Sequence, residues 1–151
     1  VKRYPLARQA FELASARHGH LRLRIANDIP HATLPLFVAA CDLILCTSET
    51  EGWPNSVKEA LACNVPFVST DVSDLRDIAR EESSCRVCAP DAQTIADEIC
   101  SVLSRPAPRD LRRFMLGMHV DVASDQLIGI YESLLSRDRQ GLATPPIVRA
   151  S

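Results

Sequence analysis

The stretch from Leu43 to Thr70 reads LILCTSETEGWPNSVKEALACNVPFVST and decides the fold. It opens with a continuous apolar run, Leu43 to Cys46, which is typical of a strand buried on both faces of a parallel sheet. A polar loop over 47–55 and a predicted helix over 56–62 follow. A second apolar run, Val65 to Ser69, predicts the next buried strand. Because a helix links the two runs, they are expected to pair in parallel.

The segments on both sides continue this alternation. Helices are predicted over 5–16, 33–40, 74–81, 91–103, 109–118 and 123–135, and strands over 21–25 and 85–88. Asp91 stands where it can cap its helix. The pattern predicts an α/β fold, a Rossmann-like parallel sheet flanked by helices. Such a domain normally opens with its central strand, whereas this chain opens with a helix, so we expect the first strand to be missing.

Size and charge narrow the function classes. The chain has 151 residues, which suits one domain over 1–137 with a flexible tail over 138–151. The formal net charge is −2 and the basic residues are scattered, which argues against a nucleic-acid partner. We expect a cytoplasmic protein, because we identify neither a secretion signal nor an apolar run long enough to span a bilayer.

Six cysteines are expected to be free thiols that pack as small hydrophobic residues. They are Cys41, Cys46, Cys63, Cys85, Cys88 and Cys100. Cys85 and Cys88 form a lone C-x-x-C pair, and a zinc site needs about four ligands. Within a strand these two side chains would also point to opposite faces of the sheet. We therefore predict no metal site.

The loop after the first buried strand carries the candidate site, since open parallel sheets bind ligands beyond the carboxyl ends of their strands. Gly52 allows a close approach of the backbone to a ligand. Asn55 is expected to cap the helix that follows. The backbone N–H groups of Asn55, Ser56 and Val57 would then point outward at the positive end of the helix dipole. This arrangement predicts an anion site suited to a diphosphate.

Two acidic residues, Glu51 and Glu59, flank this anion site. Carboxylates accept hydrogen bonds from sugar hydroxyls, which would explain their place beside a phosphate site. However, acidic residues near a helix start also stabilise the helix with no ligand present. Residue chemistry alone leaves both interpretations open.

The motifs around this loop resemble a known family. Glu51 and Glu59 enclose seven residues, the E-x7-E pattern of retaining glycosyltransferases of the family 4 type. The runs AACD (39–42), LCTS (45–48), EGWPN (51–55) and KEALACNVP (58–66) are similar to the segments that surround that pattern in the family. The likeness covers about residues 2 to 135 and extends to bacterial enzymes of polysaccharide and teichuronic-acid assembly.

The resemblance implies the C-terminal, donor-binding half of a GT-B fold. It also implies transfer of a sugar from a nucleotide diphosphate donor to a hydroxyl acceptor, with retention of the anomeric configuration. Glu51 would contact the donor sugar as the catalytic residue, and Glu59 would accept hydrogen bonds from the ribose. Lys2 aligns with the phosphate-binding lysine of the family.

The remaining donor contacts implied by the resemblance lie in the same loop and in one distant turn. Gly52, Trp53 and Pro54 belong to the donor loop, together with the N–H groups of residues 55–57. Pro30 and His31 would lie near the base. Trp53 stands where the family more often has Phe or Ser, and as a loop residue we expect it to be exposed and to contact a ligand or another domain.

The resemblance further implies that the donor is a substrate and that no cofactor or metal ion is needed. A missing N-terminal domain would bind the acceptor, so the fragment alone is expected to be inactive. The full enzyme is a candidate for peripheral membrane association. Three alternatives stay open: a stand-alone nucleotide-binding or regulatory module, a flavodoxin-like or receiver-like interaction domain, and a domain of a sugar-nucleotide epimerase.

Overall fold

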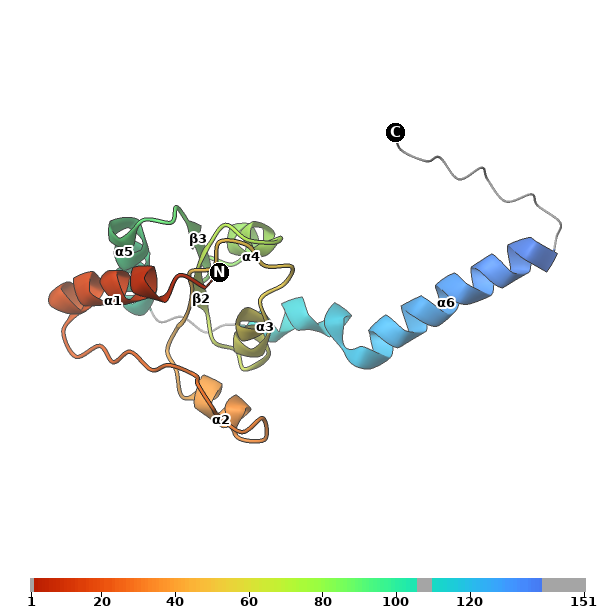
Figure 1. The fold of residues 1–151 in the computed structure, drawn as a ribbon, viewed down its shortest axis with the longest axis horizontal. Coiled ribbons are helices and arrows are strands. Elements are labelled where there is room, and N and C mark those ends of the chain that lie inside the picture. The colour runs from red at the N-terminus through yellow and green to blue at the C-terminus, as the bar shows by residue number, and fades with distance from the viewer. Residues whose placement is uncertain (1, 106–109, 140–151) are drawn as a thin grey trace. The chain divides into compact units, whose positions relative to one another are not determined.

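The computed structural model describes residues 2–105 and 110–139. Two compact units make up the chain, Val1–Met115 and Leu116–Ser151. The first unit contains a parallel sheet of three strands in the order β1, β2, β3 and most of the helices. This α/β sheet flanked by helices (Figure 1) confirms the predicted fold class. The elements are α1 (Tyr4–His18), α2 (Leu34–Ala39), β1 (Ile44–Cys46), α3 (Asn55–Ala62), β2 (Phe67–Thr70), α4 (Leu75–Glu81), β3 (Arg86–Cys88), α5 (Ala92–Leu103), the 3-10 helix η1 (Leu111–Met118) and α6 (Val120–Arg139).

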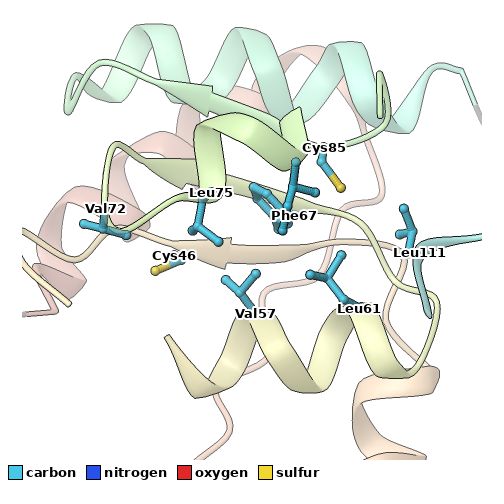
Figure 2. Packing of buried hydrophobic residues seen from close by; sticks show 9 residues of the cluster. Cys46, Val57, Leu61, Phe67, Val72, Leu75, Cys85 and Leu111 are labelled. Atoms are coloured by element: carbon cyan, nitrogen blue, oxygen red, sulfur yellow. The ribbon is translucent and has the colours of Figure 1, made fainter. Parts of the chain in front are cut away.

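Side chains of β2 alternate between the two faces of the sheet, and each face carries its own hydrophobic cluster. Phe67 belongs to cluster 1, which joins the sheet to α3, α4 and the start of η1 (Figure 2). Val68, the next residue, belongs to cluster 2, which joins the sheet to α1 and α5. The period of two along a strand produces this division. The complete burial of both side chains explains why the strand reads as an unbroken apolar run.

The two cysteines of the C-x-x-C pair lie on opposite faces, as the sequence predicts. Cys85 is buried in cluster 1, whereas Cys88 packs against cluster 2. All six cysteines are free thiols in the structure. Half-burial of the Cys88 thiol raises its pKa to about 11, with a further contribution from the negative charges of Glu98 and Asp91. This thiol is therefore protonated and unreactive near neutral pH.

The prediction of a strand over 21–25 is wrong. Residues 21–27 adopt no strand and add no ladder to the sheet. Leu21 packs against cluster 2, but Ile25 is 58% exposed. The alternation of Leu and Arg fits an extended segment, yet a strand also needs a neighbour for its backbone groups. Within the described residues β1 pairs only with β2, so residues 21–25 do not pair with the outer edge of β1.

Most of the described part of the second unit is α6, which follows the last residues of η1. This helix runs from Val120 to Arg139, longer than the predicted helix over 123–135. Many of its apolar side chains are exposed: Val120, Val122, Leu127, Ile128, Ile130, Tyr131, Leu134 and Leu135. Of the predicted tail over 138–151, residues 140–151 lie outside the described residues.

Helix α5 begins with the predicted cap. The Asp91 carboxylate accepts hydrogen bonds from the backbone N–H and the hydroxyl of Thr94, both at 2.8 Å. These bonds, the backbone one first, hold the pKa of Asp91 below its ordinary value of 3.8. Because the folded-state pKa is depressed, the resulting stability is present above 3.8 and is lost as the pH falls through the folded-state pKa.

Replacing Asp91 with asparagine is expected to keep the cap and to remove this pH dependence, since Asn caps helices about as well as Asp. The stability difference between wild type and Asp91→Asn should stay constant from pH 7 to about 5 and shift in favour of the variant below pH 4. Urea denaturation at pH 7, 5, 4 and 3 measures it. Asp91→Ala, which removes the cap, should be less stable than both at pH 7. Parallel pH profiles for wild type and Asp91→Asn would contradict the assignment.

Candidate functional site

Buried hydroxyl groups mark the carboxyl edge of the sheet. Thr47 and Ser48 follow β1 directly, while Ser69 and Thr70 end β2. All four are at most 4% exposed. The Thr70 hydroxyl donates to the carbonyl oxygen of Ser48 at 2.5 Å and so ties the loop after β1 to the end of β2. The loop that the sequence singled out thus starts from a fixed point at the edge where such sheets bind ligands.

The N-terminal segment is fastened to the same point. The Arg3 guanidinium donates to the carbonyl oxygens of Thr47 and Ser48, at 3.0 and 3.1 Å. In return, the Thr47 hydroxyl donates to the carbonyl oxygen of Lys2 at 2.9 Å. Arg3 has a φ of 39°, in the left-handed region that costs energy for a residue other than glycine. These bonds hold that conformation and keep the exposed Lys2 beside the loop.

Glu51 is oriented by a side chain of its own loop. The Ser48 hydroxyl donates to the Glu51 carboxylate at 2.9 Å. The Ser48 side chain is buried, and the Glu51 side chain is half-buried. Neighbouring Gly52 is exposed, and a Cβ atom there would meet nothing within 4 Å. The described structure therefore gives no steric reason for a glycine at this position.

Helix α3 starts one residue earlier than predicted, so the expected cap is wrong. Asn55 is the first helical residue, and Pro54 occupies the N-cap position with no side-chain cap bond. The fixed φ of proline, −64° here, suits the entry into a helix. The Pro54 carbonyl oxygen accepts hydrogen bonds from the N–H groups of Val57 and Lys58, both at 3.1 Å.

This geometry also corrects the predicted set of free amides. The N–H of Val57 is engaged by Pro54, and the Val57 side chain is fully buried in cluster 1. In the described part of the chain, the N–H groups of Asn55 and Ser56 have no acceptor. Both residues are exposed, so these two amides are the ones that a ligand can reach. They lie at the positive end of the helix dipole.

Trp53 is half-buried, which makes the prediction of an exposed side chain wrong. Its ring packs against cluster 1, and the Lys58 ammonium lies 5.5 Å from the ring centroid. Such a cation–π contact attracts the ammonium to the face of the ring. The indole Nε1 is buried and has no hydrogen-bond partner among the described residues. A loop aromatic residue next to an apolar helix face finds more stabilisation in the core than in water.

Glu59 is the fifth residue of α3, about one turn from its start, and is half-buried. Its carboxylate makes no ion pair or hydrogen bond within the described residues, unlike that of Glu51. Pro30 and His31 precede α2, and their carbonyl oxygens accept hydrogen bonds from Thr33 and from Leu34, the first residue of that helix. Both are exposed and neither is hydrogen-bonded to the loop over 47–57.

A shallow hollow of about 390 Å³ lies elsewhere, against α1 and the start of α5. Its lining is mostly apolar: Gln9, Glu12, Leu13, Ala16 and Ala92. A site for an anionic ligand needs amides or cations, and this lining offers neither in quantity. The carboxyl edge of the sheet therefore remains the candidate site.

Sequence reasoning missed Arg3 and Thr70, and gave Thr47 and Ser48 no role. Adjacent hydroxyl pairs, Thr47-Ser48 and Ser69-Thr70, end two successive buried strands. Since parallel strands end at the same edge, the two pairs could have been expected to meet there. No local pattern signals Arg3, whose bonds reach residues more than forty positions away in the chain.

Among the described residues, no helix has both the length and the apolar character that a membrane span requires.

Residues 5–105, which include the loop and both buried strands, match the family model described as glycosyl transferases group 1. The chain is also 30% identical over 81 residues to TuaC of Bacillus subtilis (strain 168), a candidate glycosyltransferase of teichuronic acid biosynthesis. That match covers 54% of this chain and about a fifth of the relative. Because the family model spans well over half of the sequence, the chain belongs to the glycosyl transferases of group 1.

Proposed function

We propose that this chain is the donor-binding domain of a retaining, GT-B-type glycosyltransferase of the family 4 kind. The reaction moves a sugar from a nucleotide diphosphate donor to a hydroxyl acceptor in the synthesis of a cell-surface polysaccharide. One observation carries the proposal: the exposed amides of Asn55 and Ser56, which have no acceptor among the described residues, begin α3 at the carboxyl edge of the sheet. The Lys2 backbone and the Glu51 carboxylate are held at that edge, because they accept hydrogen bonds from the hydroxyl groups of Thr47 and Ser48.

The diphosphate would bind at the start of α3, where a positive charge and free hydrogen-bond donors lie together. Helix N-termini stabilise anions through their dipole and their free amides. Lys2 adds a full positive charge beside the same loop. As the sugar leaves, negative charge develops on the nucleoside diphosphate, and stabilising that charge is the main catalytic task of the domain. No metal ion takes part in the proposed step.

Glu51 and Glu59 bind the hydroxyl groups of the donor. Glu51, which precedes α3, contacts the donor sugar, and Glu59 on α3 accepts from the ribose. The free carboxylate of Glu59 suits this task, because no described residue competes for it. Gly52, Trp53 and Pro54 shape the loop between the acids, while the turn with Pro30 and His31 faces the base.

The whole enzyme would add the parts that this domain lacks. An N-terminal domain binds the acceptor, and closure of the cleft between the domains completes the catalytic site. The enzyme works in the cytoplasm and associates peripherally with the membrane where its acceptor is assembled. The domain alone is expected to bind nucleotide weakly and to transfer nothing.

Titration of the protein with UDP, GDP and ADP, followed by NMR, tests the proposal. One of the three is expected to bind, and Glu59→Ala should weaken its binding by about 10- to 100-fold, the loss of one hydrogen bond to a charged group. Glu81→Ala, at an exposed position of α4, is the matched control and should bind as wild type does. Failure of all three nucleotides to bind at millimolar concentration would contradict the donor-site proposal.

A further inference from the structure

Ser48 has an unusual set of partners for a loop residue. It is 3% exposed, and its carbonyl oxygen accepts from both Thr70 and Arg3. Its backbone is therefore fixed from two sides, by the end of β2 and by the N-terminal segment. The hydroxyl on this fixed backbone donates to the Glu51 carboxylate at 2.9 Å.

The fold itself does not demand the bond between Ser48 and Glu51. A serine followed three positions later by glutamate also occurs in capping boxes, but no helix begins at Ser48. A buried serine at the end of a strand can satisfy its hydroxyl on the backbone, as Ser69 does by donating to the carbonyl oxygen of Thr70. Ser48 donates to a carboxylate instead. This bond uses one oxygen of Glu51 and leaves the other without a described partner.

We propose that Ser48 is a positioning residue that orients Glu51 toward the donor sugar. The inference rests on the proposed function and assigns a role to a residue that the function alone does not involve. A free glutamate side chain samples many rotamers, and fixing it on binding costs conformational entropy. The hydroxyl of Ser48 selects the rotamer before the donor arrives, so that the carboxylate meets the sugar already in place.

Removal of the Ser48 hydroxyl should affect binding of the sugar portion of the ligand and not of its nucleotide portion. Ser48→Ala is expected to weaken binding of a nucleotide sugar by about three- to tenfold, because a flexible Glu51 side chain must then be immobilised when the sugar binds. Binding of the corresponding nucleoside diphosphate should stay within about twofold, because it does not contact Glu51. A general disturbance of the loop would instead weaken both ligands together.

The experiment compares UDP with UDP-glucose, GDP with GDP-mannose and ADP with ADP-glucose on the full chain by NMR titration. Ser69→Ala is the matched control, since it removes a buried strand-end hydroxyl that bonds the backbone and not Glu51. It should leave the ratio of the two affinities unchanged. In the Glu51→Ala background, Ser48→Ala should have no further effect on nucleotide-sugar binding, as expected of a coupled pair.

A measurement without ligand separates this inference from the proposed function. Three-bond couplings should show one dominant Glu51 rotamer in wild type and rotamer averaging in Ser48→Ala. Unchanged couplings, or equal losses for the nucleotide sugar and the nucleoside diphosphate, would overturn the positioning role. Wild-type protein that binds none of the six probes would overturn the donor function, while the couplings would still decide whether Ser48 orients Glu51.

Discussion

Leu75→Ala is expected to lower the free energy of unfolding by about 2–5 kcal/mol. Leu75 is fully buried in cluster 1, between α4 and the sheet, next to Phe67 (Figure 2). Truncation removes apolar contacts and leaves a cavity that the surrounding side chains fill only in part. Urea denaturation followed by circular dichroism measures the change. Since α4 contributes no residue to the proposed donor site, the substitution tests the core separately from binding.

Leu36→Ala is the control for this substitution. Leu36 lies on α2 and is 74% exposed, so the same change of side chain should alter the stability by less than about 0.5 kcal/mol. Similar losses for the two variants would contradict the burial of Leu75 and with it the packing of α4 onto the sheet.

Asn55→Pro is expected to weaken nucleoside diphosphate binding by about 10- to 100-fold without unfolding the domain. A charge-assisted hydrogen bond contributes about 1.5–3 kcal/mol, which corresponds to this range. The position accepts proline well: Asn55 is the first residue of α3, and its N–H has no acceptor in the described part of the chain. Pro54 already has a ψ of 118°, in the extended region that a residue before proline prefers.

The comparison with Asn55→Ala isolates the amide. Alanine removes the same side chain but keeps the N–H, so its affinity for the diphosphate should stay close to that of wild type. NMR titration gives the affinities, and thermal denaturation checks that both variants are folded. If proline and alanine at this position bind the ligand equally, the amide of Asn55 does not hold the diphosphate.

The sequence predicts the buried sheet well because its signal is local and strong. The apolar runs 43–46 and 65–69 correspond to β1 and β2, and Asp91 caps α5 as expected. The segment over 21–25 shows where local patterns fail. Alternating apolar and polar residues indicate that one side of a segment is apolar. Whether the segment forms a strand also depends on a neighbouring strand, which the segment's own sequence does not specify.

In the candidate site too, features with a local sequence signal could be predicted, and features that depend on distant residues could not. The position of the loop and of its two acids, Glu51 and Glu59, could be read from the order of elements. The predicted cap role of Asn55 and the predicted free amide of Val57 are wrong, because a one-residue shift of the helix start changes which amides are free. The bonds from Arg3 and Thr70 join segments remote in sequence, so they appear only once the chain is folded.

In the part of the chain that the structure describes, the outer edge of β1 has no partner strand, and this has a consequence for how the sheet behaves in solution. Backbone N–H and C=O groups along a strand edge offer a template to which a strand of another molecule can add, the first step of intermolecular aggregation. β1 contains three residues, and short edge strands are one of the devices by which proteins limit such addition. The brevity of β1 thus limits the addition of foreign strands at this edge of the sheet.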